Sequence, residues 1–381
     1  MKVAVTVLTF CVAALLSLGM VMLYSSSIDS LDRRTHTEIG AHYLVMQLIW
    51  CGLGLGLCAA AALTNSKLLK KFAWPILGLM VVLLILVVIP HVGKRINGAS
   101  RWFSFHGVSF QPSEFAKIAL ILALAWYGER FQRHMHTWWR GIVYPGLFIG
   151  LTLGLIFIEP DVGNALLLAA VSSVMLLAAG IRWRYFLPPV LACLFAVGVF
   201  IYKNPMRSER IYSWLHLEET RRDKGLQAYQ ARIALGSGGW TGLGLGNGRQ
   251  KLGWVPEHHT DFILAIIGEE LGLIATLLII AAFIAIVTCG VYIARHGRDT
   301  FSMLLATGIT FLIGVQAMIN IAVVTNTFPN KGLPLPFISY GGSNLLAMLT
   351  CVGLLLSVAR QGRTIESRAG DDLDVIEPQI A

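Results

Sequence analysis

Long uncharged runs of apolar residues recur along this chain and constrain its fold more than any other feature of the sequence. A helix that crosses the ~30 Å hydrocarbon core of a bilayer needs about 20 apolar residues, because lipid offers no partner for unsatisfied backbone groups. Nine runs meet that requirement: residues 3–24, 43–63, 72–90, 141–158, 162–181, 185–202, 271–294, 301–324 and 337–358. The sequence therefore predicts an all-α, polytopic membrane protein.

The balance of residue types excludes an ordinary soluble enzyme. Of the 381 residues, 56% are hydrophobic and 13% are charged, whereas an average soluble domain has about 25% charged residues. The formal net charge of +9 is spread mainly over short connections between the apolar runs, so we expect no nucleic-acid partner. All six cysteines fall within apolar runs, and we interpret them as small apolar fillers rather than a disulfide framework or a zinc site.

A tenth run, residues 115–127, is short and contains Lys117, so hydropathy leaves it open between a membrane span and a buried half-helix. The distribution of basic residues favours a span, because cytoplasmic loops collect Lys and Arg. With ten spans and a cytoplasmic N-terminus, the cytoplasmic segments hold 14 Lys and Arg residues against 6 in the short outside loops. We therefore expect ten transmembrane helices with both termini in the cytoplasm.

One connection, residues 203–260 between the seventh and eighth predicted spans, is far longer than the others and lies outside in this topology. Leu226, Tyr229 and Ile233 have helical spacing there and predict an amphipathic helix, with a solvated linker as the alternative. The glycine-rich stretch 236–248 lacks the Walker pattern and its lysine, and a sharp re-entrant turn is expected instead. In this interpretation residues 1–360 form the transmembrane domain, and residues 361–381 form a disordered cytoplasmic tail.

Ionisable side chains at membrane depth are costly unless they are paired or face water, so each is a candidate for function. Glu114 and Lys117 lie three residues apart at the start of the short span and can neutralise each other on one helix face. A structural ion pair and a substrate contact fit that spacing equally well. The preceding segment brings Arg101 and other cations to the same mouth, and guanidinium groups suit phosphate oxygens. The charged turn at residues 159–164 fits either a tight outside turn or a functional group.

A further polar group closes the long loop, where Asp261 falls at the boundary between water and hydrocarbon. A carboxylate partly removed from water has its pKa raised toward the range of a general base. Glu257, His258, His259 and Asp261 could also bind a divalent cation, Mg²⁺ or Mn²⁺, and the spacing leaves this open. Residues 330–344, rich in Pro and Gly, predict irregular backbone that lies against protein or a watery cavity.

Five sequence blocks resemble, in the right order, the signature blocks of the SEDS family of bacterial shape, elongation, division and sporulation proteins. The blocks are residues 97–102 (NGASRW), 111–117 (QPSEFAK), 159–163 (EPDVG), 256–262 (PEHHTDF) and 335–343 (LPFISYGGS). Residues 248–254 and 330–334 are more similar to the division member than to the elongation member. The resemblance implies a ten-span glycosyltransferase of the bacterial inner membrane that polymerises lipid II into peptidoglycan at the division septum.

The resemblance also implies roles for individual residues. Asp261 matches the family's essential aspartate, and is expected to take the proton from the acceptor hydroxyl as undecaprenyl diphosphate leaves. The candidates for binding the substrate are Arg101, Glu114, Lys117, His259, Ser339 and Ser343. The implied partners are a class B penicillin-binding protein and other membrane proteins of the division machinery. A lipid II flippase and a non-catalytic scaffold for that partner are the alternatives, and no cofactor is implied beyond the open question of a divalent cation.

Overall fold

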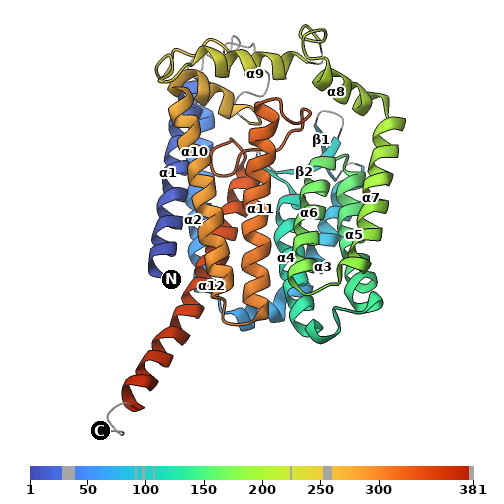
Figure 1. Ribbon diagram of the computed structural model, residues 1–381. Coiled ribbons are helices and arrows are strands. Elements are labelled where there is room, and N and C mark those ends of the chain that lie inside the picture. Colours follow the sequence, from blue (N-terminus) through green and yellow to red (C-terminus); the bar gives the residue numbers. More distant parts are fainter. Residues whose placement is uncertain are drawn as a thin grey trace.

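The computed structural model describes residues 1–27, 39–90, 92–96, 99–105, 108–223, 225–251 and 260–376, which form a bundle of long helices (Figure 1). The helices are α1 (Lys2–Ser27), α2 (Ile39–Leu63), α3 (Ser66–Val88), α4 (Pro112–Arg130), α5 (Tyr144–Ile158), α6 (Val162–Ala178), α7 (Trp183–Lys203), α8 (Pro205–Leu215), α9 (Leu226–Ser237), α10 (Ile263–Arg295), α11 (Thr300–Val324) and α12 (Gly342–Ile376). Two short helical turns, η1 (Gln132–His134) and η2 (Trp139–Val143), precede α5.

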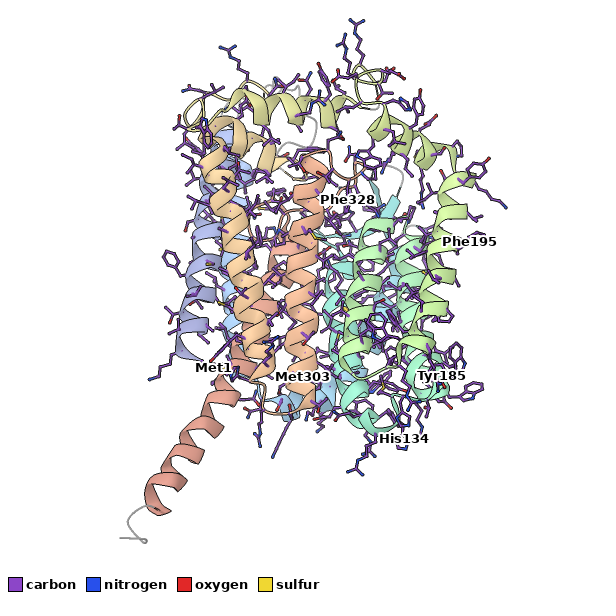
Figure 2. The ribbon with its side chains drawn as sticks, in the orientation of Figure 1. Met1, His134, Tyr185, Phe195, Met303 and Phe328 are labelled. Carbon is purple, nitrogen blue, oxygen red and sulfur yellow. The ribbon has the colours of Figure 1, made fainter. Side chains whose placement is uncertain are left out.

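The bundle has two distinct ends. Helices α8 and α9 lie across one end, which we call the α8–α9 end, while the N-terminus and the far end of α12 lie at the opposite end (Figure 1). Figure 2 places Met1, His134, Tyr185 and Met303 at that opposite end and Phe328 toward the α8–α9 end. The N-terminus and the far end of α12 therefore lie on the same side of the bundle.

Among the described residues, eight helices are long and apolar enough to cross a membrane, which confirms the prediction of a polytopic membrane protein. They cover Lys2–Ser26, Tyr43–Leu63, Ser66–Val88, Trp139–Ile158, Trp183–Lys203, Ile263–Arg295, Thr300–Val324 and Gly342–Gly362. The other two predicted spans are present as α6, which has only 17 residues, and as α4, which carries the charged block. The count of ten spans stays a prediction.

Helix α4 lies among other helices, and this explains why its sequence is a poor match to a lipid-facing span. It contacts α3, α11, α6 and α12, and most of its side chains are buried. Pro112 occupies its first turn, where a missing N–H group costs nothing. Because α4 faces protein rather than lipid, it tolerates charged residues that a lipid-facing helix would not.

A small antiparallel sheet precedes α4, so the expectation of an all-α protein was wrong for this segment. Its strands are β1 (Lys94–Ile96), β2 (Ala99–Phe105) and β3 (Val108–Phe110), in the order β1-β2-β3. Phe103 pairs with Phe110, and Ser104 pairs with Ser109, across β2 and β3. Strands β1 and β3 have three residues each, too few for alternation to be recognised in a sequence.

The long connection between α7 and α10 contains the expected amphipathic helix, although a different face is buried. The helix predicted around Leu226, Tyr229 and Ile233 is α9. Its buried face is a row of alanines: Ala228, Ala231 and Ala234. Helix α9 packs on α10, and small side chains on that face let the two backbones approach closely.

Two predicted spans have different ends in the structure. Helix α12 begins at Gly342 rather than at residue 337, because residues 334–341 form turns that pack against the bundle. It continues to Ile376 where a disordered tail was expected from residue 361, since extending an existing helix needs no new nucleus. Residues 377–381 lie outside the described residues. Helix α10 begins at Ile263, before the predicted span, and is broken at Gly272, whose φ is 78°.

Candidate active site

A fully buried ion pair lies in the first turns of α4. Lys117 Nζ is 2.8 Å from Glu114 Oε2, and the two side chains are 0% and 3% exposed. Residues three apart share one face of a helix, so the spacing in the sequence brings these groups together. Charges at this depth are tolerated only when they are neutralised and their hydrogen-bonding groups are satisfied.

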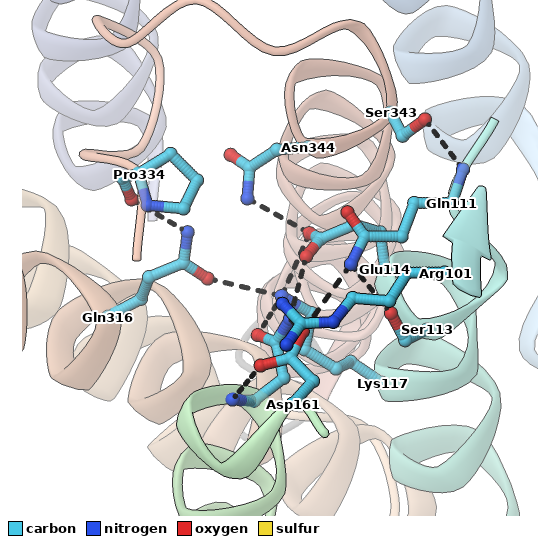
Figure 3. A network of polar contacts seen from close by, with 11 residues as sticks. Arg101, Gln111, Ser113, Glu114, Lys117, Asp161, Gln316, Pro334, Ser343 and Asn344 are labelled. Atoms are coloured by element: carbon cyan, nitrogen blue, oxygen red, sulfur yellow. Dashed lines mark hydrogen bonds and ion pairs between the residues drawn. The ribbon is translucent and has the colours of Figure 1, made fainter. Parts of the chain in front are cut away.

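Three amide side chains from three other helices satisfy this pair (Figure 3). Lys117 Nζ donates to Asn164 Oδ1 of α6 at 3.2 Å and to Gln316 Oε1 of α11 at 3.3 Å. Glu114 accepts from Asn164 Nδ2 at 3.3 Å and from Asn344 Nδ2 of α12 at 2.9 Å. The network therefore joins four helices at one point.

The network continues toward the α8–α9 end through Asp161, which caps the N-terminus of α6. Asp161 Oδ2 accepts from Asn164 Nδ2 at 3.0 Å and lies 3.7 Å from Nη1 of Arg101. Arg101, on β2, also donates to the backbone oxygens of Glu159 and Pro160, at 2.7 and 2.8 Å. The small sheet thereby holds a guanidinium group over the turn between α5 and α6.

Ser343, at the start of α12, forms hydrogen bonds with the segment that precedes α4. Its Oγ accepts from the backbone N–H of Gln111 at 3.0 Å and donates to the backbone oxygen of Ser109 at 3.4 Å. Gln111 Nε2 in turn lies 3.5 Å from Asp161 Oδ2. Four of the predicted site residues therefore belong to one connected set of contacts (Figure 3): Arg101, Glu114, Lys117 and Ser343.

Asp261 lies where the long loop ends, and its backbone is held from α11 and from the α11–α12 connection. Asn320 Nδ2, on α11, donates to the backbone oxygens of Asp261 and Leu333, at 2.8 and 2.7 Å. Ser339 Oγ donates to the backbone oxygen of Thr260 at 2.6 Å. Ser339, another predicted site residue, thus supports the backbone next to Asp261.

The α11–α12 connection also brings Asp261 close to the mouth of the buried network. A Cβ at Gly332 would overlap Asp261 Oδ2, so the carboxylate lies directly against this glycine. The side chain of the next residue, Leu333, would lie 3.4 Å from a Cβ at Gly163. Residues 331–333 therefore lie between Asp261 and the start of α6.

Two titratable groups at this end have perturbed pKa values. The pKa of Glu159 is raised to about 8, mainly by burial and also by the charge of Asp161, while Arg101 opposes the rise. The pKa of Lys331 is lowered to about 8, mainly by burial and also by two arginines of α8, while Asp161 opposes the fall. Near neutral pH, Glu159 is mostly neutral and Lys331 mostly keeps its positive charge.

Sequence reasoning identified the charged members of this site and missed the amides that satisfy them. Asn164, Gln316 and Asn344 bind the buried ion pair, and Asn320 holds the backbone of Asp261. Each of these amides lies in an apolar run, where a buried amide is costly unless it finds a hydrogen-bond partner. The signal was therefore present in the sequence.

Three of the four predicted metal ligands, Glu257, His258 and His259, lie outside the described residues, and Asp261 is described. Among the residues that the structure describes, no group of three or more His, Cys, Asp and Glu side chains could hold a metal ion. The divalent cation, and the substrate contact expected of His259, stay predictions.

Known proteins match this chain over nearly its whole length. A profile of the FtsW, RodA and SpoVE family, described as "Cell cycle protein", matches residues 6–364. The chain is 42% identical over 356 residues to the "Probable peptidoglycan glycosyltransferase FtsW" of Trichlorobacter lovleyi, and the aligned region covers 93% of this chain and 92% of that relative. It is 40% identical over 346 residues to the protein of the same name from Geobacter metallireducens, with coverage of 91% and 92%.

Solved structures share the fold as well. A chain described under "Structural coordination of polymerization and crosslinking by a peptidoglycan synthase complex" superposes with a TM-score of 0.78 at 29% identity, over 93% of this chain and 97% of that one. The rod shape determining protein RodA of Thermus thermophilus superposes with a TM-score of 0.69 at 29% identity, over 93% and 95%. With sequence and structure in agreement, the chain belongs to the FtsW, RodA and SpoVE family of cell cycle proteins.

Proposed function

We propose that this chain is a peptidoglycan glycosyltransferase of the FtsW type, which polymerises lipid II into β-1,4-linked glycan strands and releases undecaprenyl diphosphate. One observation carries the proposal: the Asp261 carboxylate is held against Gly332, next to a mouth that contains Arg101 and Lys331. A base beside cationic groups is what a transfer with a diphosphate leaving group requires. The names of the curated relatives support the same activity.

In the proposed mechanism Asp261 acts as the general base. Its carboxylate takes the proton from the 4-hydroxyl of the acceptor's N-acetylglucosamine as that oxygen attacks the anomeric carbon of the donor's N-acetylmuramic acid. The bond from that carbon to the diphosphate oxygen breaks, and undecaprenyl diphosphate leaves with the electron pair. Displacement from the opposite face converts the α-linked donor into a β-linked product, so no covalent enzyme intermediate is needed.

The burial of the cations decides which of them can meet the diphosphate. Lys117 has no exposed surface and already contacts Glu114 and two amides, so we assign it to specifying how the four helices pack rather than to binding the diphosphate. Arg101 is partly exposed, and Lys331 lies at the same mouth. These two residues are the proposed contacts for the diphosphate, with Ser339 and Ser343 fixing the backbone around them.

The proposed topology has ten spans in a transmembrane domain of residues 1–360, with both termini in the cytoplasm and the α8–α9 end outside. Eight apolar helices together with α4 and the shorter α6 supply those ten spans. The long connection, residues 203–260, then lies over the site on the outer side of the bacterial inner membrane. That side is where the proposed reaction takes place, and septal peptidoglycan synthesis is the proposed setting.

The proposed partner is a class B penicillin-binding protein, whose transpeptidase activity would crosslink the new strands. Support comes from the structural neighbour described in terms of polymerization and crosslinking by a peptidoglycan synthase complex. Other membrane proteins of the division machinery complete the proposed assembly. A divalent cation at the diphosphate is left to experiment.

The proposal is tested with purified protein and its partner in vesicles that contain labelled lipid II, with and without a chelator. The wild type is expected to lengthen glycan, and Asp261→Ala is expected to make none while keeping its melting temperature. Transfer of lipid across the bilayer without glycan synthesis would instead identify a flippase, and equal synthesis by Asp261→Ala would rule out the base assignment.

Two further variants test the position of the Asp261 carboxylate. Gly332→Ala places a methyl group where Asp261 Oδ2 lies and should lower the polymerisation rate by roughly 10-fold or more, because small misplacements of a catalytic group are costly. Gly341→Ala is the matched control, since its Cβ meets only an ordinary contact at 3.8 Å. Equal rates for the two variants would contradict the placement of Asp261.

A further inference from the structure

Helix α10 is broken, and the break is filled by the glycine-rich part of the long connection. At Gly272 the backbone leaves the helical conformation (φ 78°). The carbonyl oxygens of Glu269 and Glu270 then accept from the backbone N–H groups of Leu243 and Gly244, both at 3.0 Å. A Cβ at Gly272 would collide with the backbone of residues 240–242. The break therefore depends on the close approach of these two segments.

A second buried ion pair lies at this break and joins three parts of the chain. Lys251 Nζ is 3.1 Å from Glu270 Oε1, and the side chains are 1% and 0% exposed. Ser25 Oγ, at the end of α1, donates to Glu270 Oε2 at 2.5 Å. Lys251 Nζ also donates to the backbone oxygens of Ser25 and Gly246, at 2.9 and 2.8 Å. We call Ser25, Lys251 and Glu270 the α10 lock.

The lock is connected to Asp261 by a short, completely buried piece of helix. This half-helix, residues 263–270, begins two residues after Asp261 and ends at Glu270. Every residue in it is buried, so it is packed on all sides and cannot shift without moving its neighbours. At 1.5 Å per residue it is about 12 Å long, and a displacement at its lock end is transmitted to its Asp261 end.

We propose that the α10 lock positions Asp261 for catalysis. The inference rests on the proposed glycosyltransferase function and adds three positioning residues to it, none of which touches the substrate. The Asp261 end of the half-helix is held by Asn320 and by the Ser339 contact with Thr260. The lock holds the other end to α1 and to the glycine-rich loop, so the half-helix is fixed at both ends.

A purely stabilising role is a poor explanation for such a group. A buried ion pair contributes little net stability, because removing two charges from water costs about as much as their attraction returns. Apolar side chains of similar size would hold the same elements together at least as well. The directional contacts of the lock instead specify one position of the half-helix, as polar groups in a core can do.

The test compares polymerisation kinetics of lock variants of the full-length protein with its partner. Ser25→Ala removes one hydroxyl, Ser25→Thr restores it, and Lys251→Met combined with Glu270→Gln removes both charges without leaving either unpaired. Lys70→Met is the matched control, because Lys70 bridges Glu129 and Asp299 at 2.7 and 2.6 Å at the opposite end of the bundle. Melting temperature, kcat and KM for lipid II are measured for each variant.

In the double variant, misplacement of Asp261 should lower kcat by roughly 10- to 100-fold and leave KM within about 3-fold of the wild-type value. Ser25→Ala should lose less kcat, and Ser25→Thr should recover that loss. Lys70→Met should change the melting temperature but not kcat. Wild-type kcat in both Ser25→Ala and the double variant would overturn the lock. So would a loss of kcat in Lys70→Met that matches the loss in the lock variants. If the double variant does not fold, Ser25→Ala decides alone.

The Asp261→Ala protein separates failure of the lock from failure of the proposed function. A wild type that makes no glycan would overturn the proposed function, and an Asp261→Ala protein that polymerises lipid II would overturn the base assignment and the lock with it. An inactive Asp261→Ala protein alongside fully active lock variants would overturn the lock alone.

Discussion

Lys117 is among the largest fully buried side chains in the described part of the chain, and its environment shows how a membrane helix accommodates a charge. Glu114 balances the charge, and Asn164 and Gln316 accept from the ammonium group. The sequence predicted the pair because three-residue spacing on a helix is sufficient to bring two side chains together. It did not predict the amide partners, because these come from helices far apart in the sequence and meet only through packing.

Replacing one member of the Glu114–Lys117 pair should destabilise the protein more than replacing both. Lys117→Met leaves Glu114 buried without its cation, which is expected to lower the free energy of unfolding by about 3–5 kcal/mol. Combining Lys117→Met with Glu114→Gln should recover most of that loss, because no charge is then left unpaired. Unfolding of the detergent-solubilised protein measures both variants. A single variant as stable as the wild type would show that the pair does not neutralise a buried charge.

Glu159 should make stability depend on pH. Its carboxyl oxygens are buried without a hydrogen-bond partner among the described residues, and burial raises its pKa from 4.5 to about 8. The folded protein keeps this proton up to about pH 8, whereas the unfolded chain releases it near pH 4.5. Protonated Glu159 therefore makes its full contribution to the free energy of unfolding below pH 4.5, and this contribution is lost as the pH rises toward 8.

The variant Glu159→Gln isolates this effect. An amide cannot titrate, so the decline in melting temperature between pH 5 and about pH 8 should be smaller in Glu159→Gln than in the wild type. Parallel melting curves across this range would mean that Glu159 is ionised in the folded protein.

At the scale of whole elements, apolar runs predicted the helices well, because lipid imposes its length and hydropathy requirement on each segment separately. Their ends were predicted less well. Helix α10 starts before its apolar run because residues 263–270 are buried in protein and tolerate Glu269 and Glu270. The small sheet and the alanine face of α9 were missed because both are determined by close packing between segments, which no local pattern records.

The break in α10 gives a prediction of its own. Gly272 has a positive φ and no room for a Cβ, so Gly272→Ala is expected to lower the melting temperature through both backbone strain and collision with the glycine-rich loop. The control is Gly78→Ala in α3, where a Cβ meets nothing within 4 Å and alanine favours the helix. Equal melting temperatures for the two variants would mean that the break does not depend on glycine.

At the scale of the whole molecule, the arrangement of the two ends agrees with the charge bias of the sequence. The N-terminus and the far end of α12 share one end of the bundle, and α8 and α9 cover the other (Figure 1). An even number of spans puts both termini on one side of the membrane. Basic residues in the connections predicted which side, a feature that the fold alone does not determine.

Labelling of single cysteines tests this topology. In a variant that lacks the six native cysteines, Ser237→Cys at the end of α9 should react in intact cells with a maleimide that cannot cross the membrane. Arg298→Cys, between α10 and α11, should react only after the cells are opened. The reverse pattern would place the α8–α9 end in the cytoplasm, where lipid II could not be polymerised on the outer surface.

The most direct test of the central claim is the rate of glycan elongation from labelled lipid II by Asp261→Asn with its partner. Asparagine keeps the size of the side chain and loses only the ability to accept a proton. If Asp261 is the general base, the rate is expected to be lower by roughly 10²- to 10⁴-fold, with an unchanged melting temperature. A rate within about 3-fold of the wild type, too small a loss for a general base, would contradict that assignment.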